Sequence, residues 1–206
     1  MYLEPETTAL IIIDMLNDFV KEDGSLVVPN AISLVPAQKK LLETAREQGI
    51  KVIYLTDNHL PDDPEFKMWP AHAIAGSVGA AVIDELEPLP DERVIPKRRY
   101  SGFFGTDLDL TLREAGIDTI ILVGVLTDIC VMYTSADASA RNYTVIVVSD
   151  ATGTNDEDTH QFTLKHIETI HGSEVTTAEN LLESLEKTSR TKSFIGLSSD
   201  KPNVAP

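Results

Sequence analysis

The sequence holds one cysteine among 206 residues, and its 17 basic residues face 33 acidic ones. One cysteine excludes an intramolecular disulfide, so the thiol is either a small buried apolar group or a reactive one. The formal net charge of −16 disfavours nucleic acid and anionic membranes as partners, because both attract clusters of Lys and Arg. We therefore expect a small-molecule partner.

Long apolar segments are also missing. No run reaches the ~20 residues that span a bilayer, and the first residues lack the positive region and apolar core of a signal peptide. These absences predict a cytoplasmic protein. The composition, 42% apolar and 24% charged, is that of an ordinary globular chain with enough residues for one sizeable core.

Apolar, β-branched runs alternate with helix-compatible segments, which is the pattern of βα units in a parallel sheet. The runs at 9–13 and 119–125 carry no polar alternation, as is typical of central strands covered on both faces. We predict an α/β fold of three layers, with a six-stranded, mostly parallel sheet between helices on both faces. The predicted strands are 8–14, 51–56, 93–97, 119–123, 144–149 and 174–176, and the predicted helices lie near 32–48, 76–86, 107–115, 128–141, 157–171 and 178–187.

The composition changes after position 187. We assign 1–187 to one domain and 188–206 to a C-terminal extension, which is weakly basic and polar. Such a segment either frays or docks on an acidic body, its own or that of a neighbouring copy.

Polar residues stand where the predicted strands end, and ligands of open parallel sheets bind beyond the carboxyl ends of the strands. Asp14 ends an apolar strand, where a carboxylate needs a partner. Lys97 ends another strand and would supply the opposite charge. Cys130 falls near the start of a predicted helix, a position that favours anions and lowers a thiol pKa. Taken singly, these residues also fit a turn cap, a solvated lysine and a buried thiol.

Three motifs in this order resemble the isochorismatase-like cysteine hydrolases over about 8–180: IDMLNDF at 13–19, PK at 96–97 followed by YSGF at 100–103, and GVLTDICV at 124–131. The resemblance implies a catalytic triad of Asp14, Lys97 and Cys130. It also implies a cis peptide between Val125 and Leu126, with the amides of Leu126 and Cys130 forming an oxyanion hole.

A second cluster comprises Asp57, His59 and His72. Residues two apart in an extended segment face one side, so Asp57 and His59 can hold one ion while His72 closes a third position. This donor set suits a divalent metal, with Zn²⁺ as the first choice and Fe²⁺ or Mn²⁺ as alternatives. By spacing alone, a surface loop with two histidines fits as well.

The same three positions, with WPAHAIAGSVGA at 69–80, resemble the nicotinamidase/pyrazinamidase subgroup. The resemblance implies that the metal holds the pyridine nitrogen while Phe19 and Trp69 sandwich the ring. Leu16 stands where the family usually has glutamine, and Ile129 precedes the nucleophile where some members carry a polar residue. Both are therefore candidate substrate-binding positions that affect substrate range.

The expected activity is hydrolysis of nicotinamide, or a close analogue such as pyrazinamide, to the acid and ammonia through a thioester. The resemblance also suggests a homo-oligomer. Two alternatives stay open: a family amidase for another small amide or carbamoyl compound, and a catalytically idle binding or oligomerisation module. The histidines at 160, 166 and 171 are interpreted as structural or solvated.

Overall fold

The computed structural model describes residues 3–195 and shows a six-stranded, wholly parallel sheet in the order β3-β2-β1-β4-β5-β6. The three-layer α/β prediction is confirmed. The strands are β1 (Thr8–Ile13), β2 (Lys51–Asp57), β3 (Arg93–Lys97), β4 (Thr119–Val125), β5 (Thr144–Gly153) and β6 (Glu174–Thr176).

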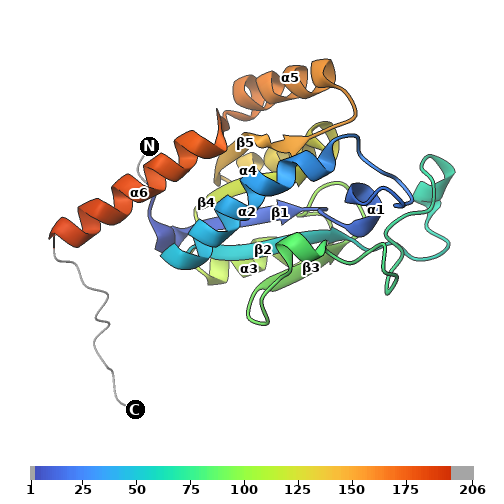
Figure 1. The fold of residues 1–206 in the computed structure, drawn as a ribbon, viewed down its shortest axis with the longest axis horizontal. Coiled ribbons are helices and arrows are strands. Elements are labelled where there is room, and N and C mark those ends of the chain that lie inside the picture. Colours follow the sequence, from blue (N-terminus) through green and yellow to red (C-terminus); the bar gives the residue numbers. More distant parts are fainter. Residues whose placement is uncertain (1–2, 196–206) are drawn as a thin grey trace, which may run out of the picture.

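Helices cover both faces of the sheet (Figure 1). They are α1 (Asn17–Val20), α2 (Ala31–Gln48), α3 (Leu108–Glu114), α4 (Met132–Ala140), α5 (Glu157–His166) and α6 (Ala178–Ile195), with π-helical turns at Thr127–Val131 and Ile167–His171. The side chains of β1 alternate between the two faces. Leu10 and Ile12 join the core under α2 and α6, while Ile11 and Ile13 join the core under α3, α4 and α5. An uninterrupted apolar strand thus contributes side chains to both cores.

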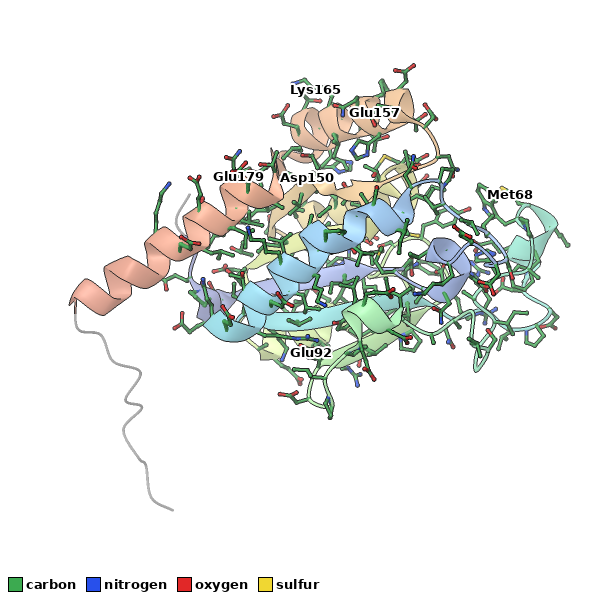
Figure 2. The ribbon with its side chains drawn as sticks, in the orientation of Figure 1. Met68, Glu92, Asp150, Glu157, Lys165 and Glu179 are labelled. Carbon is green, nitrogen blue, oxygen red and sulfur yellow. The ribbon has the colours of Figure 1, made fainter. Side chains whose placement is uncertain are left out.

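Charged side chains lie on the outer faces of the helices (Figure 2). Figure 2 shows the side chains of Glu157, Lys165 and Glu179 directed away from the body, on the outer faces of α5 and α6. Among the described residues, no helix combines the length and the apolar character that crossing a bilayer requires.

The helix predicted near 76–86 is wrong. Only Asp84–Leu86 forms a single 3₁₀ turn, and the residues before it form turns. The backbone carbonyls of Gly79 and Ala81 accept hydrogen bonds from the amides of Asp18 and Asn17, both at 3.0 Å. A helix would need those carbonyls for its own ladder, so the tertiary pairing replaces it.

The last helix also differs from expectation, because α6 runs past the predicted end at Lys187 to Ile195. The remainder of the predicted extension, 196–206, lies outside the described residues. Elsewhere the predicted elements are found within a few residues of their expected ends, and Gly49 caps α2 in the left-handed region at φ 72°.

Candidate active site

The order of strands in the sheet reverses at β1: β2 and β3 are added on one side of it, and β4 to β6 on the other. In open parallel sheets such a reversal leaves a crevice at the carboxyl ends of the strands. Asp14 directly follows β1, Asp57 ends β2, Lys97 ends β3, and the turn with Cys130 follows β4. Four neighbouring strand ends therefore deliver the candidate residues to one edge.

Lys97 is the centre of this group. Its Nζ lies 2.8 Å from Oδ2 of Asp14, 2.5 Å from Oδ1 of Asp57 and 3.3 Å from Sγ of Cys130. All four side chains are at most 7% exposed. Of the three N–H donors of an ammonium, two have hydrogen-bond acceptors in Asp57 and Cys130, and Asp14 forms an ion pair with the charge. The structure therefore brings together the three residues of the expected triad.

The backbone around the triad is tightly constrained. The turn after β1 puts Asp14 at φ 53°, and the peptide between Val125 and Leu126 is cis, as expected from the resemblance. Gly124, at φ 118°, runs so close to β1 that a Cβ there would collide with the carbonyl oxygen of Ile13. Only glycine suits both conditions, which explains the glycine inside an otherwise branched strand.

The electrostatics favour a neutral thiol at rest. Burial raises the pKa of Cys130 well above its usual value; Lys97 opposes this shift and the carboxylates of Asp14 and Asp57 add to it. The expected lowering by a helix start is wrong in sign, because Cys130 sits in a buried π-helical turn between acidic groups. Burial, together with Asp57, also raises the pKa of Asp14 to about 6, against the effect of Lys97. The thiol therefore needs a base to become a nucleophile.

The second cluster also assembles. One ligand atom from each of Asp57, His59 and His72 lies within 4.8 Å of the others, and all three residues are buried. Nδ1 of His72 donates to the Pro70 carbonyl at 2.7 Å, and Nδ1 of His59 lies 3.3 Å from the Asp63 carboxylate. In each ring Nε2 is the nitrogen that faces Oδ2 of Asp57, at 3.7 Å for His59 and 3.9 Å for His72.

Nε2 of His59 is fully buried and has no hydrogen-bond partner, although it lies 3.7 Å from Oδ2 of Asp57. A buried polar nitrogen without a partner is costly. Two imidazole nitrogens and a carboxylate oxygen facing one point are the donors that a divalent metal takes. The residues present therefore fit a metal ion, and Asp57 belongs to both clusters through its two oxygens.

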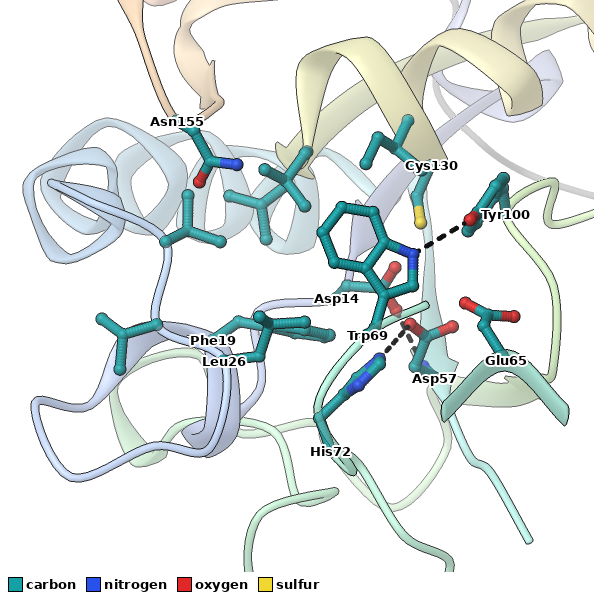
Figure 3. A pocket seen from close by; sticks show the side chains of 15 residues that line it. Asp14, Phe19, Leu26, Asp57, Glu65, Trp69, His72, Tyr100, Cys130 and Asn155 are labelled. Carbon is teal, nitrogen blue, oxygen red and sulfur yellow. Dashed lines mark hydrogen bonds and ion pairs between the residues drawn. The ribbon is translucent and has the colours of Figure 1, made fainter. Parts of the chain in front are cut away.

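A pocket opens above these groups, and Figure 3 shows Cys130, Asp14, Asp57 and His72 along one wall. Phe19, Trp69 and Ile129, the expected substrate-binding residues, are among the residues that line it. Trp69 donates its indole N–H to the Tyr100 hydroxyl at 3.1 Å. Other lining residues are Leu26, Val27, Val28, Glu65, Tyr100, Val125, Leu126 and Asn155. Apart from the catalytic and metal-facing groups, the walls are mostly apolar.

The prediction that Leu16 is a substrate-binding residue is wrong. It is fully buried in the core under α2 and is absent from the pocket wall. Its segment forms a β-bridge with Val82. Leu16 therefore packs against the core instead of meeting a substrate.

Sequence reasoning missed two carboxylates that position the site. Asp63, 2% exposed, supports His59 and also binds Arg98 and Arg99. Asp18 accepts from the Ala73 amide at 2.7 Å, which ties the loop of His72 to α1. Asp63 precedes Pro64 and caps the turn there, so in the sequence it is indistinguishable from an ordinary cap.

The family model for the isochorismatase domain matches residues 8–180. The N-carbamoylsarcosine amidase of Thermoplasma acidophilum is 41% identical, with a TM-score of 0.77 over 84% of this chain and 96% of that one. Nicotinamidase/pyrazinamidase PncA from Bacillus subtilis is 32% identical, with a TM-score of 0.78 over 82% and 99%. Pyrococcus horikoshii pyrazinamidase, solved in complex with zinc, is 27% identical, with a TM-score of 0.78 over 83% and 99%. The chain belongs to the isochorismatase family and is an amidohydrolase.

Proposed function

We propose that this amidohydrolase deamidates nicotinamide, or a close uncharged aromatic analogue such as pyrazinamide, through a thioester on Cys130. The observation that carries the proposal is the buried donor set of Asp57, His59 and His72 beside the thiol, in a pocket walled by Phe19 and Trp69. Aromatic side chains favour stacking on a flat ring. A solved pyrazinamidase with zinc among the similar structures supports the metal.

The charge of the pocket supports a neutral substrate. Its lining includes Asp14, Asp57 and Glu65, and among the described residues no arginine or lysine lines it. Lys97 lies beneath the pocket, with two carboxylates already at its ammonium. A substrate that carries its own carboxylate would find no free cation from the protein and would meet like charge instead.

The reaction follows from the triad geometry. Asp14 takes the proton of the Cys130 thiol, and the Lys97 ammonium, 3.3 Å from Sγ, stabilises the thiolate. Sγ attacks the amide carbon, and the backbone amides of Leu126 and Cys130 donate to the oxyanion. Asp14 returns its proton to the leaving nitrogen, so that ammonia departs and a thioester remains.

A water molecule then attacks the thioester while Asp14 accepts its proton. The carbon–sulfur bond breaks, Cys130 leaves as a thiolate, and the acid is released. A metal held by Asp57, His59 and His72 would supply a Lewis acid that orients a ring nitrogen of the substrate.

A second candidate is a carbamoyl amidase, and the 41% identity to the N-carbamoylsarcosine amidase favours it. Ammonia release from nicotinamide, pyrazinamide and N-carbamoylsarcosine, with and without a chelator, separates the two. We expect turnover of the two aromatic amides and its loss on chelation. Preferred turnover of N-carbamoylsarcosine would refute the proposal.

Three variants test the assigned roles. Cys130→Ala is expected to lose ammonia release from nicotinamide, and most activity remaining would exclude the covalent mechanism. His59→Ala and His72→Ala are expected to lower metal content and to raise the KM for nicotinamide. If both quantities stayed at the wild-type level, the cluster would be only a buried loop.

A further inference from the structure

His160 on α5 is a buried histidine that the mechanism above does not use. Its side chain is 8% exposed and lies against the turn that carries the nucleophile. Nδ1 lies 2.9 Å from the hydroxyl of Thr127, and Nε2 lies 3.1 Å from the backbone carbonyl of Ser149 on β5. The ring therefore bridges the sheet and the start of the π-helical turn.

The two contacts indicate which ring nitrogen of His160 carries a hydrogen. A carbonyl oxygen only accepts, so Nε2 carries the hydrogen and donates it to Ser149. In the neutral ring Nδ1 is then the acceptor, and the Thr127 hydroxyl donates to it. Both ring nitrogens and the hydroxyl are satisfied in a buried site, where an unmade hydrogen bond is costly. This arrangement leaves Thr127 one favoured hydroxyl orientation.

Thr127 is fully buried and stands next to Leu126, whose amide is proposed to receive the oxyanion. The following residue, Asp128, accepts a hydrogen bond from the hydroxyl of Thr154, directly after β5. Two consecutive residues of the nucleophile turn are thus tied to the β5–α5 segment by side chains. Within the turn, the amides of Ile129 and Val131 both donate to the Leu126 carbonyl at 3.1 Å.

We propose that His160 is a positioning residue, which acts through the Thr127 hydroxyl to hold the amides of Leu126 and Cys130, and Sγ of Cys130, in the geometry for attack. The proposal rests on the covalent mechanism under the proposed function. Oxyanion stabilisation depends on donors that are already in place before charge develops. A shift of about 1 Å in such a site can lower the rate about 100-fold.

The test uses the whole enzyme and the variants Thr127→Val, Thr127→Ser and His160→Phe, with His166→Phe on the same helix as the matched control. Val keeps the shape of Thr and removes the hydroxyl, whereas Ser keeps the hydroxyl. Thr127→Val and His160→Phe are expected to lower kcat for nicotinamide about 10- to 100-fold, with KM within about twofold. Thr127→Ser is expected to rescue kcat to within about threefold, and His166→Phe to match the wild type.

The double variant Thr127→Val/His160→Phe is expected to be no slower than the slower single variant, because both changes break one contact. Additive losses in kcat would overturn the proposal. So would unchanged kcat in Thr127→Val together with a lowered melting temperature, because the contact would then be structural only.

A second readout needs no turnover. Pyridine-3-carbaldehyde adds the Cys130 thiol across its carbonyl: an S–C bond forms, the C=O π bond breaks, and the proton ends on the oxygen. Trp69, the one tryptophan of the chain, lines the pocket and reports binding by fluorescence. We expect Kd for the aldehyde to rise about tenfold in Thr127→Val and to return in Thr127→Ser. A wild type that binds the aldehyde without deamidating nicotinamide refutes the proposed function alone, while equal Kd values in all variants refute the role of His160.

Discussion

Replacing Asp63 by Asn removes one negative charge from a buried carboxylate that supports His59. Burial alone would raise the pKa of Asp63, but Arg98, a backbone amide and His59 together lower it well below its usual range, so the group is ionised at all working pH values. Its Oδ2 accepts from Arg98 at 2.8 Å and 3.0 Å and lies 3.3 Å from Nδ1 of His59. An amide nitrogen at that position would point a donor at two donors.

The size of the expected loss in metal affinity follows from these contacts. Arg98 and Arg99 have side chains 46% and 40% exposed, so solvent screening limits their ion pairs to at most about 1 kcal/mol each. The larger effect is on His59, because a lost partner for the second ring nitrogen of a metal ligand typically weakens metal binding about 10- to 100-fold. We expect Asp63→Asn to raise the metal Kd by that factor, or about 1.4 to 2.8 kcal/mol.

The assay is competition for Zn²⁺ between the protein and a chromophoric chelator at pH 7, with thermal unfolding of the metal-free protein measured in parallel. Asp62→Asn is the matched control, since Asp62 is the exposed neighbour in the same loop. A metal Kd for Asp63→Asn equal to that of Asp62→Asn would refute the reasoning that Asp63 orients His59. It would leave the ligand set itself untouched.

Three further predictions concern the triad, β4 and the core. Burial and Asp57 raise the pKa of Asp14 to about 6, so this base is ionised only above that pH. We therefore expect log kcat/KM for the amide to fall with a slope of one below about pH 6. A flat profile down to pH 4.5 would exclude Asp14 as the base. Gly124→Ala should lower the free energy of unfolding, measured by urea denaturation, by about 3 kcal/mol, because the added Cβ meets the Ile13 carbonyl at positive φ. The control Gly153→Ala should lose less than about 1 kcal/mol, since its Cβ meets only the end of the Leu34 side chain. Leu122→Ala, in the centre of β4 and fully buried, should cost about 3 kcal/mol by the same measurement; a loss under 1 kcal/mol would mean that the site collapses around the cavity.

Several features of this protein follow from the order of residues alone. Uninterrupted apolar runs require cover on both faces, and this requirement predicted the three-layer parallel sheet. Asp14, Asp57 and Lys97 could be located because each stands where such a run ends, and parallel strands deliver those ends to one edge. The resemblance of the three motifs then pointed to the triad and to the cis peptide between Val125 and Leu126.

The remaining features depend on contacts between distant segments. The predicted helix near 76–86 is absent because its carbonyls bind Asn17 and Asp18, some 60 positions away. Burial raises the pKa of the Cys130 thiol, and two carboxylates from other strands add to this shift against the effect of Lys97, so the neutral thiol is favoured at rest. Leu16 turns into the core, and Asp63 becomes the support of His59, for reasons that no local pattern encodes. The sequence determined which residues stand at the strand ends that form the site. Burial and long-range hydrogen bonds decided the protonation and the partners of these residues, because both properties depend on which other groups are buried beside them.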